Sequence, residues 1–200
     1  TWDEAAWGYN AYSLGIDGKD EFGKFLPHTF LESFGDYKPP LYAYLDVIPV
    51  KLFGLNEFAT RFPSALFGVL TVLMTYFLVK RIFGYKVKTQ NLKEELKIVN
   101  CKLEITALLS ALFLAISPWH ILLSRAAFEA NVASFFIVFG AWAFLAAVQD
   151  RKWYLILSAV SFAFTFYIFN TARIVSPILV LLLAFMYRRK LLEIKKVTVL

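Results

Sequence analysis

The chain alternates long apolar stretches with short polar and basic segments, and the apolar stretches approach the length needed to cross a membrane. Five of them are found at residues 64–83, 105–123, 126–148, 153–169 and 174–187. They are apolar on every side of a helix, as expected for helices that contact lipid. The last two are short for a hydrocarbon core about 30 Å thick, which needs roughly 20 residues. The pattern predicts an all-α polytopic membrane protein with about five transmembrane helices.

Residues 1–57 have a different pattern and form the first of two expected domains. Apolar side chains at near-helical spacing predict a short interfacial helix from Asp3 to Leu14. A second apolar stretch, residues 39–53, is too short and too polar to cross the membrane, so it is expected to be an interfacial or re-entrant helix. The second expected domain is the transmembrane region, residues 58–200.

Composition supports a membrane protein and excludes an ordinary soluble domain. Hydrophobic residues make up 59% of the chain and charged residues 18%, whereas soluble domains have about 25% charged residues. The mean hydropathy is +0.59. The single cysteine, Cys101, offers no disulfide framework and no cysteine metal site.

The distribution of charge predicts the orientation in the membrane. Residues 1–57 contain nine acidic residues against four lysines. Basic residues gather instead in the connections after the first and third apolar stretches and in the tail: Lys80, Arg81, Lys86, Lys88, Lys93, Lys97, Lys102, Arg151, Lys152, Arg188, Arg189, Lys190, Lys195 and Lys196. Cytoplasmic loops are enriched in Lys and Arg, so residues 1–57 are expected to be extracytoplasmic and the C-terminus cytoplasmic, in the cell membrane. The net charge of +6 is then a topology signal, and no nucleic-acid partner is expected.

The termini suggest that this sequence belongs to a longer enzyme. The chain starts at Thr1 without a signal peptide, so an upstream membrane helix is expected to place residues 1–57 outside. Residues 195–200 resemble the approach to a further span. We therefore expect both an N-terminal helix and a C-terminal part to be missing here.

Two adjacent acids, Asp3 and Glu4, are the candidate catalytic residues. An acceptor hydroxyl must lose its proton as it attacks, and a carboxylate beside the membrane can serve as general base. The two side chains point about 100° apart on a helix, so one can face a reaction while the other binds a metal or caps the helix. An acidic pair that only complements the helix dipole is the alternative interpretation.

Lys38 is the first candidate for binding a donor phosphate. Pro39 and Pro40 follow it and restrict the local backbone, and a lysine held there can bind a lipid phosphate as it leaves. A lysine that merely extends toward the interface is the alternative. Asp36 is an uncertain metal ligand or a partner of Lys38, and His28 is a weaker metal candidate. A divalent metal is an open expectation, and no other cofactor is expected.

Further candidates lie at the ends of the apolar stretches. Arg125 and Arg173 are expected to add positive charge for the donor phosphate on the face that holds Asp3 and Glu4. Glu129 follows Arg125 by four residues, so a simple ion pair between them is the alternative. His120, Glu129 and Tyr42 are candidates for the lining of a pocket. No Walker loop or dinucleotide turn is found, which favours a donor delivered by the bilayer.

Several motifs resemble glycosyltransferase family 39, which contains dolichyl-phosphate-mannose protein mannosyltransferases and aminoarabinose transferases with the GT-C fold. The motifs are Trp2-Asp3-Glu4, Asp36-Tyr37-Lys38-Pro39-Pro40-Leu41-Tyr42, Leu52-Phe53-Gly54, the segment from Phe58 to Leu66, and the segment from Ser117 to Arg125. The resemblance implies inverting transfer of a sugar from a polyprenyl phosphate to a hydroxyl of a glycan, lipid or protein outside the cytoplasm. It also implies that Asp3 is the base with Glu4 as its partner, and that Lys38 contacts the lipid phosphate. The aminoarabinose branch has an acid directly before this lysine, where this chain has Tyr37.

Two other classes of function remain open at this point. In a transporter or lipid flippase, Arg125, Glu129 and Arg173 would line a substrate path, but such proteins place polar groups near the middle of the bilayer. A non-catalytic scaffold would tolerate the loss of Asp3. The enzyme hypothesis makes a structural demand: Asp3, Lys38 and at least one of Arg125 and Arg173 should converge around one cavity.

Overall fold

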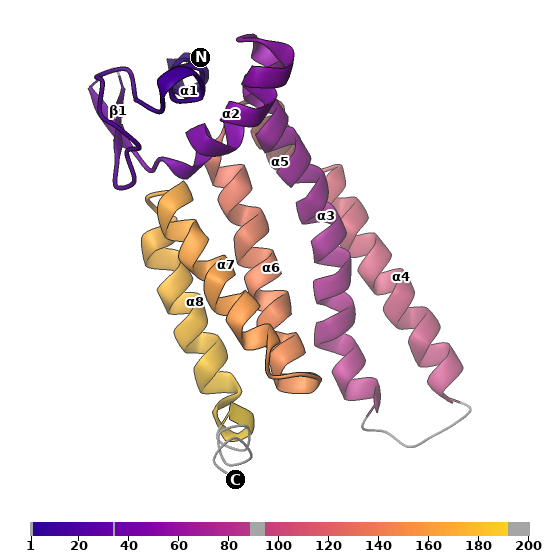
Figure 1. Cartoon of the computed structure of the whole chain (residues 1–200). Helices are drawn as coiled ribbons and strands as arrows, with labels where there is room; N and C mark the ends of the chain where they lie inside the picture. Colours follow the sequence, from indigo (N-terminus) through magenta and orange to yellow (C-terminus); the bar gives the residue numbers. More distant parts are fainter. Residues whose placement is uncertain (1, 34, 89–94, 192–200) are drawn as a thin grey trace.

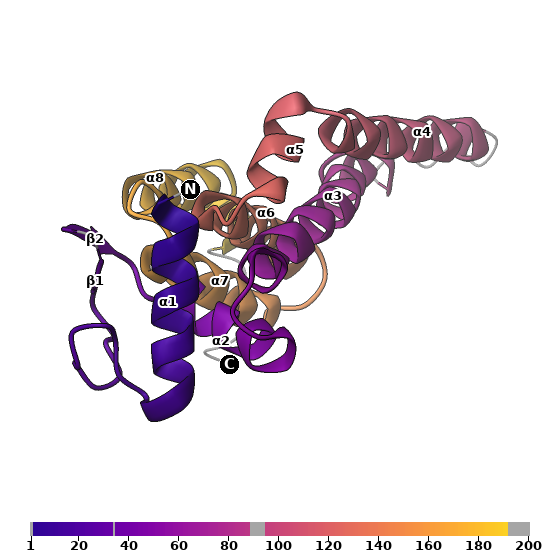
Figure 2. The same cartoon turned by 90° about the horizontal axis from the view of Figure 1, so that it is seen from above.

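The protein consists of a helical bundle with a cap across one end. The computed structural model describes residues 2–33, 35–88 and 95–191. The bundle contains α3 (Glu57–Lys88), α4 (Glu95–Ala115), α6 (Glu129–Gln149), α7 (Tyr154–Ile168) and α8 (Ala172–Met186). The cap contains α1 (Trp2–Asp17), a β-hairpin and α2 (Leu41–Phe53), and the short α5 (Pro118–Arg125) lies near the same end (Figure 1). Seen from above, α1 runs across the bundle axis (Figure 2).

The hairpin is a departure from the all-α expectation. Strand β1 (Leu31–Ser33) pairs antiparallel with β2 (Asp36–Lys38), in the register Leu31 to Lys38 and Ser33 to Asp36. Gly35 has a φ of 78° in the turn, a conformation that glycine adopts without strain. Strands of three residues are too short for a period-of-two pattern to be recognised in sequence. The two predicted cap helices do form, as α1 and α2.

The bundle agrees with a membrane protein, but the predicted second span is not one straight helix. Among the described residues, two helices are long and apolar enough to cross a membrane, Glu57–Gly84 and Glu129–Gln149. The stretch predicted as a span at 105–123 is divided into α4 and α5, which bend by 57° around the break and count as a third span only if taken together. Pro118 explains the break, because proline disfavours helical conformation in the residue before it. Helices α7 and α8, predicted as spans at 153–169 and 174–187, have 15 residues each.

Small polar side chains hold the apolar helices of the bundle together. Ser158 and Ser161 on α7 donate hydrogen bonds to the carbonyl oxygens of Gly140 and Phe136 on α6, at 2.8 and 2.7 Å. Thr165 on α7 and Ser176 on α8 share a hydrogen bond of 2.7 Å. Hydroxyl bonds to backbone carbonyls are typical of helix contacts in lipid, where an unsatisfied polar group is costly.

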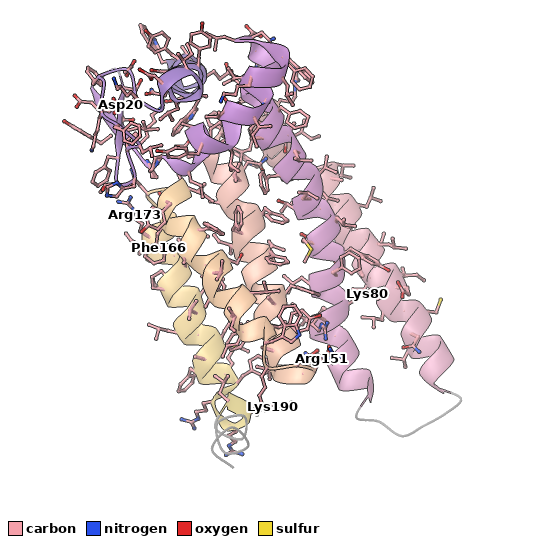
Figure 3. All side chains as sticks on the ribbon, viewed as in Figure 1. Asp20, Lys80, Arg151, Phe166, Arg173 and Lys190 are labelled. Atoms are coloured by element: carbon pink, nitrogen blue, oxygen red, sulfur yellow. The ribbon has the colours of Figure 1, made fainter. Side chains whose placement is uncertain are left out.

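Basic side chains mark the end of the bundle away from the cap. Lys80 on α3 pairs with Glu104 on α4 at 2.5 Å, and Arg81 pairs with Asp150 at the end of α6. Arg151 and Lys190 also lie toward this end, whereas Asp20 lies in the cap (Figure 3). The charge asymmetry noted in the sequence therefore separates the two ends of the folded molecule.

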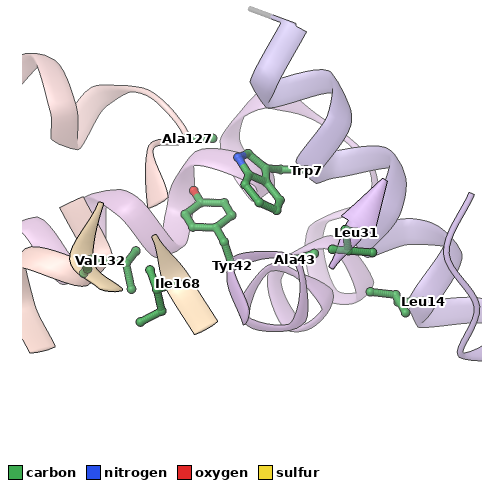
Figure 4. Close-up of a cluster of buried hydrophobic side chains, with 10 residues drawn as sticks. Trp7, Leu14, Leu31, Tyr42, Ala43, Ala127, Val132 and Ile168 are labelled. Atoms are coloured by element: carbon green, nitrogen blue, oxygen red, sulfur yellow. The ribbon is translucent and has the colours of Figure 1, made fainter. Parts of the chain in front are cut away.

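Cap and bundle share one apolar core, which fixes how the cap sits. Trp7 on α1 and Tyr42 on α2 contact each other with ring centroids 5.1 Å apart. Figure 4 shows this pair beside Val132 and Ile168, which come from α6 and α7. All four side chains are nearly or fully buried. Burying large apolar side chains stabilises by about 1.5–3 kcal/mol each, so the cap is anchored to the bundle by packing.

Candidate functional site

A cavity in the cap brings together the first acid of the chain and the interfacial lysine. Lys38 at the end of β2 forms an ion pair with Asp3 in the first turn of α1. The two residues line a cavity of about 460 Å³ together with Trp2, Ala6, Ser33 and Asp36. The Asp3 carboxylate is partly exposed and the lysine is almost fully buried. A carboxylate is thus presented to a cavity beside a fixed positive charge.

Lys38 owes its position to the packing of the cap. Its backbone is held in the hairpin by pairing with Leu31, which is itself buried. Its ammonium nitrogen lies 5.2 Å from the centroid of the Trp7 ring, within the range of a cation–π interaction. The charges of Lys38 and Asp3 both act on the carboxyl group of Glu129 at the start of α6. Glu129 therefore belongs to the surroundings of the Asp3–Lys38 pair.

Glu4 has a separate environment, although it is adjacent to Asp3 in the sequence. Both of its carboxylate oxygens accept hydrogen bonds from Arg61 on α3, at 2.6 and 3.1 Å. The backbone N–H of Ala127, between α5 and α6, also donates to it at 3.4 Å. The Arg61 hydrogen bond lowers the pKa of Glu4 to about 2. Glu4 thus connects the cap to two parts of the bundle. Its carboxylate is occupied by these hydrogen bonds, which does not favour a role as a general base.

Asp36 lines the same cavity as Asp3 but is exposed, and its carboxylate accepts a hydrogen bond from the backbone N–H of Tyr37 at 2.8 Å. Among the described residues, no three His, Cys, Asp or Glu side chains lie close enough together to hold a metal ion. A divalent metal in the cavity would have Asp3 and Asp36 as its protein carboxylates and would need oxygen ligands from a substrate to complete its coordination.

Arg125 and His120 line a different hollow, a groove between α3, α4 and α5. The groove has a volume of about 770 Å³ and mostly apolar walls. His120 shares a hydrogen bond of 3.1 Å with the carbonyl oxygen of Gly68 on α3. Among the described residues, the ion pairs do not include one between Arg125 and Glu129. The residues that line the cavity of Asp3 and Lys38 include neither Arg125 nor Arg173, so the expected convergence with an arginine is absent from that lining.

Arg173 at the start of α8 lies beneath the hairpin (Figure 3). Its side chain donates a hydrogen bond to the carbonyl oxygen of Phe166 at 3.0 Å. The guanidinium carbon is 5.4 Å from the centroid of the Phe30 ring, just before β1. These contacts give Arg173 a role in joining the loop of the cap to the bundle.

Two further ionisable groups of α2 are buried next to the core. Tyr42 donates a hydrogen bond to the carbonyl oxygen of Thr60 at 2.9 Å, and burial raises the pKa of its hydroxyl. Asp46 is fully buried, and neither carboxylate oxygen has a hydrogen-bond partner within the described part of the chain. Burial raises the pKa of Asp46 to about 7. Tyr42 packs in the apolar core and is not among the residues that line the cavity of Asp3 and Lys38.

Three residues of this region were not singled out as candidate site residues from sequence. Arg61 is the partner of Glu4, and the signal available was an arginine in the first turns of an apolar span, where charge is costly. Ser33 and Trp7 reach the surroundings of Lys38 only through the hairpin and the crossing of α1 over α2. No local pattern in the sequence indicated those contacts.

Comparisons with known proteins find a likeness for part of the chain. Residues 37–90 match the model of a family described as dolichyl-phosphate-mannose-protein mannosyltransferase. An uncharacterized protein of Aquifex aeolicus (strain VF5) is 39% identical over 64 residues, which cover 32% of this chain and 13% of the relative. No solved structure matches the chain significantly. The family match begins at Tyr37, so it includes Lys38 and Arg61 but not Asp3 or Glu4. Together with the apolar helices, it supports a membrane protein related to the mannosyltransferase family.

Proposed function

We propose that this chain forms the donor-binding region of a membrane glycosyltransferase. The enzyme transfers a sugar, with inversion, from a polyprenyl phosphate to a hydroxyl of a glycan, lipid or protein. The observation that carries the proposal is the Asp3–Lys38 pair in the cavity of the cap. The family match, whose first residues include Lys38, supports it.

The pair suits a reaction in which a phosphate leaves and a hydroxyl attacks. Lys38 is a nearly buried cation, so a donor phosphate that enters the cavity competes with Asp3 for its ammonium group. The Asp3 carboxylate is then available to take the proton of the acceptor hydroxyl. The acceptor oxygen bonds to the anomeric carbon, the bond from that carbon to the phosphate oxygen breaks, and the polyprenyl phosphate leaves with the electron pair. Lys38 stabilises the negative charge of the leaving phosphate.

We also propose on which side of the membrane the cap lies. The cap would lie on the extracytoplasmic side of the cell membrane, because the basic side chains gather at the opposite end of the bundle. A lipid-linked donor can reach this position laterally from the bilayer. The GT-C architecture belongs to the same proposal.

The test is sugar transfer from radiolabelled polyprenyl-phosphate sugars by membranes that contain the full-length protein. We expect Asp3→Asn to lower turnover by roughly 10²–10⁴-fold, the usual contribution of a general base. The matched control is Asp17→Asn, an exposed aspartate at the other end of α1, which should keep the native rate. Equal turnover in Asp3→Asn and native protein would overturn the assignment of the base. No transfer with any donor would overturn the proposed function itself.

A further inference from the structure

Ser33 is a buried hydroxyl in the wall of the cavity, and no role has yet been given to it. The residue is 3% exposed and lines the cavity with Asp3 and Lys38. Within the described part of the chain, its Oγ has no hydrogen-bond partner. Leaving a buried hydroxyl without a partner is unfavourable, so such a group calls for an explanation. A ligand oxygen in the cavity would supply the missing bond.

The register of the hairpin places Ser33 relative to Lys38. Ser33 is opposite Asp36, and Lys38 is two residues further along β2, opposite Leu31. Residues directly opposite in an antiparallel pair share a face, as do residues two apart on one strand, so Ser33 and Lys38 lie on the same face as diagonal neighbours. Diagonal neighbours are about 7–8 Å apart. This is a spacing of the strands: the Ser33 hydroxyl stays close to its strand, whereas the Lys38 ammonium lies at the end of a long side chain, on Asp3 and 5.2 Å from the centroid of the Trp7 ring. The two polar groups thus enter the cavity from different positions, which suits two adjacent groups of one ligand.

We propose that Ser33 binds a hydroxyl group of the transferred sugar while Lys38 binds the phosphate attached to it. This assignment rests on the proposed function, because it takes the ligand of the cavity to be a phosphate-linked sugar. A serine hydroxyl can both donate and accept a hydrogen bond, as a sugar hydroxyl can. Ser33 is thereby a residue that determines which sugar the cavity accepts, and it takes no part in proton transfer.

Binding of small ligands to the full-length protein tests the assignment without requiring transfer. The probes are mannose 1-phosphate, glucose 1-phosphate and inorganic phosphate, titrated against native protein, Ser33→Ala and Ser33→Cys. We expect both variants to weaken binding of at least one hexose phosphate by about 3- to 10-fold, the value of one neutral hydrogen bond, and to leave the affinity for inorganic phosphate unchanged. The matched control is Ser13→Ala, because Ser13 already donates to the carbonyl oxygen of Asp20 outside the cavity.

Hexose 1-phosphates that lack one ring hydroxyl make the binding test more specific. In native protein, removing the hydroxyl that contacts Ser33 should weaken binding as much as Ser33→Ala does, and in Ser33→Ala its removal should cause no further loss. An equal loss for hexose phosphate and inorganic phosphate would overturn the proposal, since Ser33 would then serve the phosphate or the fold. Native binding of inorganic phosphate without any preference for a hexose phosphate would also overturn it. Loss of transfer in Asp3→Asn is a separate result, so failure of the catalytic proposal and failure of the sugar contact can be distinguished.

Discussion

Asp3 and Glu4 at the start of α1 each form an ion pair, and the two pairs differ in which partner is accessible to solvent. In the Asp3–Lys38 pair, the acid side chain is 49% exposed and the lysine 9%. In the Glu4–Arg61 pair, the acid is 11% exposed and the arginine 39%. An accessible carboxylate beside a buried cation can exchange its partner for a substrate, whereas a buried carboxylate with two hydrogen bonds to one guanidinium is held in place. We therefore propose a chemical role for the first pair and a stabilising role for the second.

Removing the cation of each pair should give the largest contrast in activity. We expect Lys38→Met to lower kcat/KM for sugar transfer by roughly 10²–10³-fold, because it removes an electrostatic group aimed at the leaving phosphate. Arg61→Met should leave the kcat/KM of the correctly folded fraction within about 3-fold of native. A 3-fold change corresponds to a difference of about 0.6 kcal/mol in the barrier. Steady-state kinetics on both variants in matched membranes measures the contrast. Comparable losses in the two variants would remove the distinction between the pairs.

Stability should show the reverse order. Glu4→Gln keeps the shape of the side chain but loses its charge-assisted bonds to Arg61, and we expect it to lower the free energy of unfolding by about 2–3 kcal/mol. Because the pKa of Glu4 is lowered to about 2, its stabilising contribution is present above its ordinary pKa and is lost as the pH falls toward 2. Thermal unfolding in detergent at pH 7 and pH 3 measures both effects, with Asp3→Asn as the control. A larger loss in Asp3→Asn than in Glu4→Gln would contradict the comparison.

A third acid of the cap, Asp46, should behave unlike either pair, with the smallest effect. Its pKa is raised by burial to about 7, so the folded state holds a proton that the unfolded state releases near pH 4, and stability should fall as the pH rises from about 4 to about 7. Asp46→Asn should remove this dependence and stabilise the protein at pH 8 by about 1–2 kcal/mol, less than the full gain because the amide is also buried without a partner.

Unfolding temperatures of native protein and Asp46→Asn between pH 4 and pH 8 provide the measurement. The exposed Asp17→Asn is again the control. Parallel pH profiles for all three proteins would show that Asp46 is ionised in the fold and has a partner.

The sequence predicts the structure best where a local property decides it. Apolar stretches long enough for lipid indicated α3 and α6, and charge indicated which end of the bundle is basic. The sequence predicts less where a contact between distant residues decides the structure. Nothing near Glu4 indicates that it binds Arg61, and nothing near Ser33 indicates a place beside Lys38. Arg125 and Arg173 share an expected depth in the membrane, but depth alone does not fix the position of a side chain around the bundle axis.

The hydrogen bond between Ala127 and Glu4 has a consequence for the order of events during synthesis. It joins residues that are 123 positions apart, and Val132 and Ile168 complete the apolar core beneath the cap. When residues 2–53 leave the ribosome, the surfaces that will hold them do not yet exist. The cap can pack against the bundle only after α6 and α7 have been made and inserted, since a contact between residues distant in sequence cannot form until both have been synthesised. The docking of the cap on the bundle is therefore a late step of biogenesis, although the residues that line the cavity all lie between Trp2 and Lys38.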